Sequence, residues 1–555
     1  MVSQRPLFVL RALTFSMLSL AASTSMAGGL DLPTITASHQ GTANANGAEA
    51  NDPSVLYYNP AGLARMKGGL QISQGFSALF INGKVEADQN ESRNGAATNQ
   101  KSDGGDPIAA DSNNPRGEPG TFWPRVLGAG GAFISMPIDD MVTAGIGVFA
   151  PGGGNLNYKS DWTGAYQIDS IAIELININP SIGIRFDDKH SLGFGVSVIG
   201  GHIRQKTQID VKGVSPYLLD STLKSGTLDL FELPTGETLA TVYGLGCQGI
   251  LATTLSAITN PICRQLILDA VGGGLADPNS SGSAQVEMYG YGLGFNVGYM
   301  FALNDKTRFG LAYRSESKVK FRGDLEWDLK EIKGSALYNA LKPGQSLEDY
   351  LRENLRPDTT TKGNLIIPAR ASANVFHQLN DKIDLMADFT FIETSAVDKI
   401  RVQLLDVKRS NGTLIKQGDA GIDTNWRDSF KVSVGGNYHH NDKLTLKSGF
   451  QYDMTPVPSA EFRHPGAPDS DRYMFSVGAN YKLKKNLTID AAYSVTFLAD
   501  SESNYTDRCR TLTRDDENGN YDPDGEACTG NGGKFKGRFF DTSIQTLSLQ
   551  MNQKF

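Results

Sequence analysis

The sequence predicts an all-β fold, a transmembrane antiparallel β-barrel of about 14 strands. Three observations lead to this prediction. Apolar and polar residues alternate with a period of two from residue 69 onward, the connections are short on one side and long on the other, and the chain has an export signal and an aromatic C-terminus. Strands that face lipid on one side and a lumen on the other look only half apolar, as here.

The alternating segments occur as pairs joined by tight polar turns. Asn and Asp dominate these turns, and both tolerate the left-handed backbone angles that suit tight hairpins. The six turns lie at residues 139–140, 187–189, 304–306, 380–381, 441–442 and 484–486. Six hairpins give twelve strands, and one strand after Gly69 and a final strand make fourteen, an even number as in bacterial single-chain barrels.

Between the hairpins the connections are long and polar or helical in pattern. They cover residues 83–123, 211–285, 326–362, 405–425 and 500–536. Short turns at one end and long loops at the other are the asymmetry of an outer-membrane barrel. The alternative, a soluble β-sandwich or propeller with evenly spaced strands, leaves these uneven loops unexplained.

The two ends of the chain agree with export. Arg5 and Arg11 precede the short apolar run "ALTFSMLSLAAS", and small residues at Ser25 and Ala27 suit cleavage after Ala27. We therefore predict a signal peptide over 1–27, the alternative being a short buried helix. The far end, "FFDTSIQTLSLQMNQKF", alternates and stops on Phe555. It resembles the terminal strand of outer-membrane β-barrels.

Composition excludes several classes of protein. Hydrophobic residues make up 39% of the 555, the mean hydropathy is -0.28, and no second apolar run reaches the length of a membrane helix, so a helical membrane protein is excluded. The net charge of -8 argues against a nucleic-acid partner. No G-x-S-x-G elbow, P-loop or H-E-x-x-H motif occurs and the seven His are scattered, which argues against an enzyme such as a lipase.

A polar, small-residue segment precedes the first strand and ends in "NDPSVLYYNPAGLARM" (51–66). This stretch resembles the N-terminal plug signature of the FadL family of outer-membrane long-chain fatty acid transporters. The resemblance continues in "YGLGFNVGYMFALNDKTRFGLAYRSESKVKFRGDL" (291–325) and "DKLTLKSGFQYDMTPVPSAEFRHPGAPDSDRYMFSVGANYKL" (442–483). It implies a fourteen-stranded barrel (69–555) with an N-terminal hatch (28–68) in its lumen and short helices in its extracellular loops.

The family resemblance also assigns roles to two short segments. Asn59, Pro60 and Ala61 match the Asn-Pro-Ala motif beside the passage, where Pro can hold a rigid bend. A break in the third strand, which in the family opens the wall toward the bilayer, matches Phe149, Pro151, Gly152, Gly153 and Gly154. Pro removes a ladder donor and Gly weakens pairing. We expect the motif to lie against this break from inside, the alternative for the break being a strand that simply ends.

Candidate ligand contacts fall into two groups. A helical apolar stripe in the loop 211–285, with Leu251, Leu255 and Ile258, and a second one with Leu347 and Leu351 match the loops that form a surface groove in the family, although both stripes could simply pack on each other. The family's inner pocket carries basic residues, and the matching positions are His202, Arg204 and Arg401. His202 departs from the expected basic residue, which leaves room for neutral hydrophobes.

Four Cys and one acidic segment lie in the predicted external loops. Local pairing would join Cys247 to Cys263 and Cys509 to Cys528, one of three possible connectivities in an oxidising compartment. Inside the second pair, oxygen-bearing residues alternate as in calcium loops, but the position expected to be Gly is Tyr521, so a solvated acidic loop is the alternative. The candidate calcium ligands are Asp516, Asn518, Asn520, Asp522 and Asp524. No other cofactor is expected.

Together these observations predict a passive outer-membrane channel for hydrophobic molecules, long-chain fatty acids first among them. The expected route is capture by the loops, binding in an apolar pocket and lateral release through the third strand. The alternatives are uptake of aromatic or alkane hydrocarbons by the same route, or a structural barrel or adhesin without transport. The expected partners are hydrophobic small molecules and outer-membrane lipid, with the protein acting as a monomer.

Overall fold

The computed structural model describes most of the chain. The described residues are 35–66, 68–88, 92–94, 121–122, 126–158, 162–165, 167–209, 276–277, 280–335, 338–339, 344–354, 356–408, 412, 414–415, 419–507 and 533–555. The predicted signal peptide (1–27) and the first part of the predicted hatch (28–34) lie outside these ranges.

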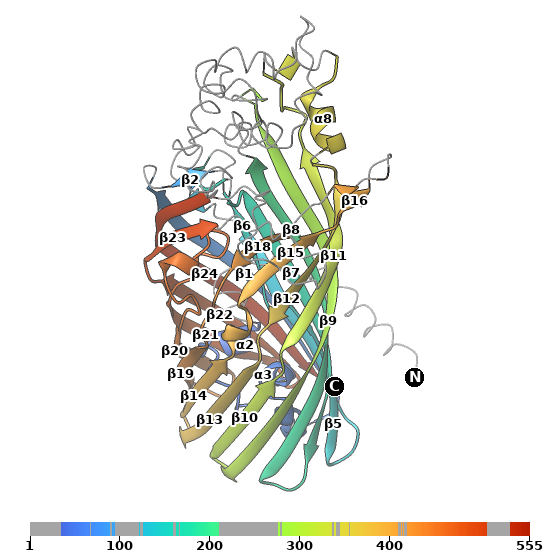
Figure 1. Cartoon of the computed structure of the whole chain (residues 1–555). Coiled ribbons are helices and arrows are strands. Elements are labelled where there is room, and N and C mark those ends of the chain that lie inside the picture. The colour runs from blue at the N-terminus through green and yellow to red at the C-terminus, as the bar shows by residue number, and fades with distance from the viewer. Residues whose placement is uncertain are drawn as a thin grey trace, which may run out of the picture.

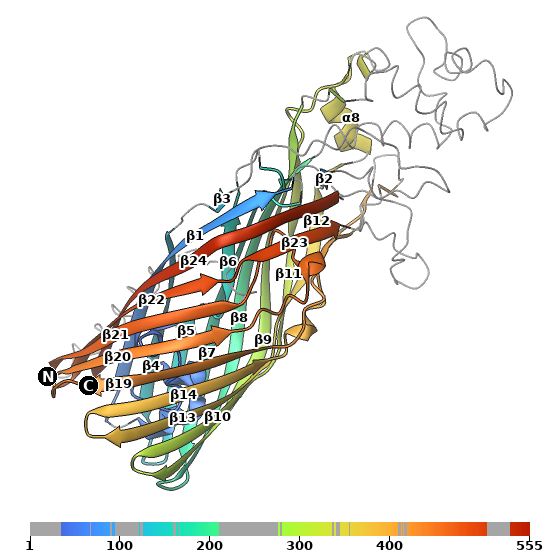
Figure 2. The same ribbon diagram turned by 90° about the vertical axis from the view of Figure 1, so that its left-hand side faces the viewer.

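Fourteen antiparallel wall strands form a closed barrel, as the sequence predicted (Figures 1 and 2). The first strand pairs with the last from Gln71–Lys554 to Ala87–Gly537, and this pairing closes the sheet. Several wall strands are interrupted and carry two labels. In wall order the strands are β1 (Gln71–Ala87), β4 (Val126–Pro137), β5 (Val142–Phe149) with β6 (Gly153–Asn157), β7 (Ser170–Arg185), β8 (His190–Ile209), β9 (Gly282–Asn304), β10 (Thr307–Arg314) with β11 (Ser317–Asp328), β12 (Thr359–Ile367) with β13 (Arg370–Asn380), β14 (Ile383–Ile392) with β15 (Lys399–Leu404), β18 (Asp419–Asp423) with β19 (Ser429–His439), β20 (Leu444–Asp453), β21 (Arg472–Lys484), β22 (Leu487–Leu498) with β23 (Ser501–Asp507), and β24 (Gly533–Lys554).

Short elements complete the described structure. The strands β2 (Arg93–Asn94), β3 (Thr121–Phe122), β16 (Val407–Lys408) and β17 (Leu414–Ile415) have two residues each, and the helices are α2 (Ala37–Gln40), α3 (Val55–Tyr58), η1 (Pro60–Arg65), α8 (Leu347–Asn354), η5 (Thr394–Ala396) and η6 (Ala460–Phe462). None of the helices in the described ranges is long and apolar enough to cross a membrane. α8 lies beyond the loop end of the barrel (Figure 1), and its Leu347 and Leu351 are buried.

The six predicted hairpins are present, but their Asn and Asp residues do not adopt the left-handed backbone angles that the sequence led us to expect. No turn Asn or Asp in the described hairpins has a positive φ. Instead the first turn residue accepts backbone hydrogen bonds through its side chain, as Asp139 Oδ1 does from Met141 N and Val142 N (both 2.7 Å). Asp187, Asn304, Asn380 and Asn441 accept such bonds in the same way. The side chains therefore close these turns without backbone strain.

The wall strands alternate between two environments, as β8 illustrates. From Ser191 to Ile199 the odd-numbered residues are buried against the lumen. The even-numbered residues between them point outward, and Leu192, Phe194, Val196 and Val198 are 40–46% exposed. This outward apolar face continues on the neighbouring strands and forms the surface that a bilayer covers.

The hatch fills the lumen with a polar side and an apolar side. In the described residues 35–66, the polar half contacts β20–β24 and β1, for example from Gln40 Nε2 to Ser494 Oγ (2.8 Å) and from Ser38 N to Gln550 Oε1 (3.0 Å). The apolar half presents Leu56 and Leu63 to Phe133 and Phe149 on the opposite wall. Irregular backbone at membrane depth is tolerated here because the protein itself buries and satisfies it.

Glycines on the inner wall allow the hatch backbone to approach closely. A methyl group at Gly193 would overlap the backbone of Pro60 and Ala61, and one at Gly449 would overlap Thr42. Other inward glycines also lie against the hatch. On one wall these are Gly145, Gly147, Gly183, Gly298 and Gly310, and on the other they are Gly435 and Gly478. The hatch is thus held between two glycine-lined surfaces where side chains would exclude it.

Candidate functional site

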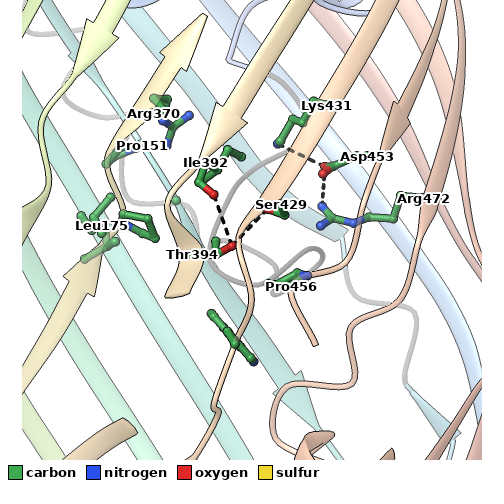
Figure 3. Close-up of a pocket in the computed structure, with 14 residues that line it drawn as sticks. Pro151, Leu175, Arg370, Ile392, Thr394, Ser429, Lys431, Asp453, Pro456 and Arg472 are labelled. Carbon is green, nitrogen blue, oxygen red and sulfur yellow. Dashed lines mark hydrogen bonds and ion pairs between the residues drawn. The ribbon is translucent and has the colours of Figure 1, made fainter. Parts of the chain in front are cut away.

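A pocket lies inside the barrel beside the break in the third strand (Figure 3). The space between its lining residues is about 530 Å³ and is partly open to solvent. Pro151 and Leu175 lie on one side of it, and Lys431, Asp453 and Arg472 lie on the other. The remaining lining residues are Gly152, Ile367, Pro368, Arg370, Ile392, Thr394, Trp426, Ser429 and Pro456.

The polar side of the pocket carries more cations than carboxylates. Asp453 Oδ2 accepts from both Lys431 Nζ (3.1 Å) and Arg472 Nη1 (2.9 Å). A second carboxylate oxygen, Asp469 Oδ1, lies 3.5 Å from Arg472 Nε. Arg370 adds a third cation to the lining. One carboxylate therefore lines the pocket against three basic residues, a balance that favours an anionic or electron-rich head group.

The third strand departs from a regular ladder at Ala150–Gly152. Phe149 pairs with Asn177 on β7, and the next paired residue, Gly153, pairs with Glu174. Four steps along the third strand thus correspond to three along β7, which makes a bulge of one residue. Ala150 packs with Leu79 and Ile544, which face the lumen, and Pro151 and Gly152 line the pocket. The break therefore forms part of the pocket wall.

Beside the break, the pairing with the second strand also stops. β4 pairs with β5 from Pro137 up to Gly131, opposite Phe149. Among the described residues, β6 is paired with β7 alone. Backbone pairing of the third strand with the second therefore ends next to the pocket, where Pro151 has no N–H to donate.

Tyr57 of the hatch joins the break to the pocket. Its ring lies edge-on to Phe149, with centroids 4.9 Å apart, and its hydroxyl accepts from Arg370 Nη1 (3.1 Å). Arg314 lies over the same ring at 5.0 Å and donates to the Tyr57 carbonyl (3.0 Å). A movement of this part of the hatch would therefore disturb the pocket and the break together.

An apolar lining runs from the loop end of the barrel to the pocket. The stacked rings of Tyr158 and Trp162 (3.9 Å between centroids) and Phe535 belong to one buried cluster. The same cluster contains Leu175 and Ile367, which line the pocket. Other members include Ile171, Ile173, Ile199, Met288, Phe321 and Leu365. These side chains are buried against one another, and the cluster reaches the pocket through Leu175 and Ile367.

The Asn-Pro-Ala motif lies on a different part of the wall from the one expected. Asn59 Nδ2 donates to the carbonyls of Tyr299 (3.2 Å) and Leu311 (3.3 Å) on β9 and β10, and its Oδ1 accepts from Ala61 N (3.1 Å). Phe149 is instead contacted by Leu56, Tyr57 and Leu63. The prediction that residues 59–61 press on the break is wrong, because inward glycines let their backbone dock on β8–β10. The rigid bend itself is present as η1.

The predicted head-group contacts are also on the wrong side of the wall. His202 and Arg204 occupy outward positions of β8, where His202 stacks on the exposed ring of Tyr289 (4.3 Å). His202 also contacts Glu174 (3.1 Å) and Glu287 (2.8 Å). Arg401 alternates with Ile400 and Val402, which pack on inner clusters, so it points outward too. The register of a strand decides whether each of its side chains faces the lumen or the outside. A difference of one residue exchanges the two faces, and the family resemblance did not place these residues on the correct one.

Several predicted residues lie outside the described ranges. These are the loop residues Leu251, Leu255 and Ile258, the cysteines Cys247, Cys263, Cys509 and Cys528, and the candidate calcium ligands Asp516, Asn518, Asn520, Asp522 and Asp524. Their roles stay predictions.

Sequence reasoning missed the basic side of the pocket. Arg370, Lys431 and Arg472 come from three strands that are far apart in the sequence, and each looks like an ordinary polar residue in an alternating strand. Arg370 follows Ile367–Pro368–Ala369, where Pro marks a strand interruption, and this was the available signal. The glycine alternation in "GFGVSV" and "AGIGVF" was a second signal, whose meaning depends on the hatch behind it.

Comparison with known proteins agrees with this architecture. The model of the family described as outer membrane protein transport protein (OMPP1/FadL/TodX) matches residues 18–529. Outer membrane protein P1 of Haemophilus influenzae is 24% identical over 486 residues (86% of this chain, 87% of the relative), and the long-chain fatty acid transport protein of Escherichia coli K12 is 23% identical over 498 residues (89% and 93%).

Solved structures share the fold. A FadL homologue of Pseudomonas aeruginosa superimposes with a TM-score of 0.64 at 22% identity, covering 95% of this chain and all of that chain (100%). The P. putida toluene transporter TodX gives a TM-score of 0.56 at 15% identity, covering 95% and 99%. Since the family model spans most of its length, the chain belongs to the OMPP1/FadL/TodX family, as an outer-membrane transport barrel for hydrophobic compounds and not an enzyme.

Proposed function

We propose that the protein takes up long-chain fatty acids passively, binds them in the pocket beside the third strand and releases them sideways into the bilayer. The observation that carries this proposal is the pocket itself, in which Arg370, Lys431 and Arg472 face an apolar lining. A long-chain carboxylate matches both parts. Its head group is an acceptor for the basic side chains, and its tail removes apolar surface from water at about 25 cal/mol per Å².

The route follows the apolar contacts. A molecule collected at the loop end passes Tyr158 and Trp162, follows the buried cluster to Leu175 and enters the pocket. Release toward Pro151 and Gly152 leads to the place where pairing with β4 stops. Sideways exit avoids re-exposing the tail to water, since hydrocarbon surrounds the barrel. No energy source is required beyond the concentration gradient and consumption downstream.

Uptake of paired substrates tests the proposal. Cells lacking other transporters of this kind, with and without this protein, are given labelled oleate, oleyl alcohol and toluene in parallel. We expect uptake of oleate to exceed that of the alcohol, since only oleate carries the carboxylate. Equal uptake of oleate and the alcohol, or uptake of toluene alone, would support the hydrocarbon alternative. No uptake of any of them would support the structural alternative.

A further inference from the structure

A row of cations lies on the outer face of the barrel at its loop end. Lys318, Lys320 and Arg322 are alternate, exposed residues of β11, and Lys362 is the exposed partner of Arg322 on β12. We call these four residues the basic girdle. Val319, Phe321 and Leu365 between them are buried toward the lumen, so the girdle side chains project from the outer surface.

A one-residue bulge places these side chains outside. On β10 the odd-numbered residues Phe309, Leu311 and Tyr313 face outward, whereas on β11 the even-numbered residues do. The pairing with β9 shifts from Arg314–Asn296 to Lys320–Tyr291, so six residues of this wall strand span five of β9. Without the bulge the three cations would point into the apolar lumen, and Val319 and Phe321 would point out.

The girdle is flanked by exposed aromatic rings. Tyr291 and Tyr289 on β9 are the direct partners of Lys320 and Arg322, and their side chains are 72% and 62% exposed. Farther from the loops the outward residues of β9 are Leu293 (65% exposed) and Phe295 (43%). Tyrosines mark the boundary between hydrocarbon and head groups on membrane barrels, so the girdle lies at the level of the outer-leaflet head groups.

The cations of the girdle are not held in ion pairs by the described acids around them. No ion pair involves Lys318, Lys320, Arg322 or Lys362 within the part of the chain that the structure describes. The acids on the same face are Glu316, Asp324, Glu326 and Asp328 on the same wall strand and Glu287 on β9, and Glu287 already contacts His202 (2.8 Å) and Tyr289 (3.0 Å). On the β1–β24 wall the outward charges at the loop end are paired instead, as in Lys84–Asp541 (2.8 Å) and Arg538–Glu86 (3.0 Å).

We propose that the basic girdle binds the phosphorylated glycolipid of the outer leaflet. Four adjacent cations at head-group level, beside apolar wall and exposed Tyr rings, match a ligand that carries phosphates on a sugar and acyl chains below it. A soluble anion would use the charges but not the Tyr289–Tyr291 surface. The proposal concerns the outer wall and does not depend on the pocket or on the transported substrate.

The test compares two full-length variants with equal changes in charge. One replaces the girdle: Lys318→Gln, Lys320→Gln, Arg322→Gln and Lys362→Gln. The control replaces four exposed cations elsewhere: Lys84→Gln, Arg538→Gln, Lys306→Gln and Lys484→Gln. Both are checked for folding by heat-modifiable migration in gels, and binding of purified lipopolysaccharide in detergent is measured with the phosphorylated and the enzymatically dephosphorylated form.

We expect the girdle variant to bind phosphorylated lipopolysaccharide about tenfold more weakly or worse than the natural protein, since each cation near an anionic surface contributes to binding. The control variant should bind like the natural protein, and dephosphorylated lipopolysaccharide should bind the natural protein and the girdle variant equally weakly. Equal loss in both variants, full binding of the dephosphorylated form, or equal competition by phosphatidylglycerol or inorganic phosphate would overturn the proposal. If the girdle variant fails to fold, single Lys320→Gln and Lys84→Gln variants give the same comparison.

Discussion

At the scale of single residues, Arg370 connects three features of the site. It lines the pocket, its guanidinium donates to the Tyr57 hydroxyl of the hatch (3.1 Å), and it begins β13 directly after the Pro368 interruption. A ligand carboxylate that reaches Arg370 would compete with Tyr57 for the same donor. Binding and release of the hatch residue could thus be linked through one side chain.

Arg370→Gln should weaken binding of oleate by about tenfold or more, the value of a hydrogen bond to a charged group, and should leave binding of oleyl alcohol nearly unchanged. Titration of the purified protein with both ligands measures this. Arg322→Gln on the outer wall is the matched control, and Tyr57→Phe removes the hatch contact while keeping the cation. Equal weakening for acid and alcohol would show that Arg370 acts on pocket shape and not on charge.

At the scale of elements, the interrupted third strand and the segment between β20 and β21 shape the path. The first combines a bulge, a Pro and a Gly with a φ of +145° at Gly153, a backbone angle that other residues rarely adopt. The second, residues 454–471, folds into the mouth of the barrel, where Pro456 lines the pocket and Val457 packs on Trp426. Each is a local departure from the ladder, and together they border the pocket.

Replacing residues 151–154 by a regular alternating strand, with one residue fewer, should remove the bulge and extend the pairing with β4. We expect this variant to fold as a heat-resistant barrel and to bind oleate, because the basic side of the pocket is untouched, but to lose most uptake. Heat-modifiable gel migration, ligand titration and cellular uptake measure the three properties. Normal uptake would mean that the route runs axially past the hatch.

His464 should make the stability of residues 454–471 depend on pH. Burial lowers the pKa of His464 to about 3, and its Nδ1 accepts from Gly466 N (2.8 Å), which requires the neutral ring. Above pH 6.5 the ring is neutral in both the folded and the unfolded segment. Below that pH the unfolded segment binds a proton that the folded one excludes, so stability of the segment should fall from pH 6.5 toward pH 3.

Hydrogen exchange of peptides within 454–471, corrected for the intrinsic rate at each pH, should therefore show opening as the pH falls. His464→Asn keeps an acceptor near the Nδ1 position and cannot become charged, so its profile should stay flat over the same range. A profile shared by both proteins would place the pH dependence on groups other than His464.

At the scale of the whole molecule, the hatch divides the lumen into two chemically different sides. Toward β19–β24 and β1 it presents amides and hydroxyls beside an open space of about 1160 Å³, and the Ser38 carbonyl accepts from Lys447 of the wall, which is paired with Asp490 (3.2 Å). Toward β4–β10 it presents Leu56, Tyr57 and Leu63. The buried apolar cluster and the break in the third strand lie on this second side.

The close contact between inward glycines and the hatch holds the hatch in the lumen, and Gly193→Val should displace the hatch from the wall. The added side chain would overlap Pro60 and Ala61, so we expect the barrel to fold while the hatch becomes accessible to protease and the ion conductance of the barrel rises. Gly200→Val on the same strand is the control, since nothing lies within 4 Å of a Cβ there. An unchanged hatch in the Gly193 variant, by protease mapping and planar-bilayer conductance, would show that its polar contacts alone fix it.

The sequence by itself determined the barrel, its six tight hairpins, its fourteen strands and the family. Each of these depends on patterns local in the chain: a period of two, Asn and Asp at turns, and a contiguous plug motif. A hairpin is fixed by its own turn and the residues next to it, so its presence can be predicted without knowing which side of the barrel wall each strand residue faces.

Only the tertiary structure decided which side of the wall each residue faces, and therefore what forms the site. The one-residue bulge at Ala150–Gly152 coincides with the predicted Pro and Gly break, whereas the bulge between Arg314 and Lys320 reverses the alternation without a clear mark in the sequence. His202, Arg204 and Arg401 lie on outward positions of their strands, whereas Arg370, Lys431 and Arg472 line the pocket from three separate strands. In a sheet a shift of one residue exchanges lumen for lipid, and closure of the barrel brings distant strands together, so neither outcome is encoded locally.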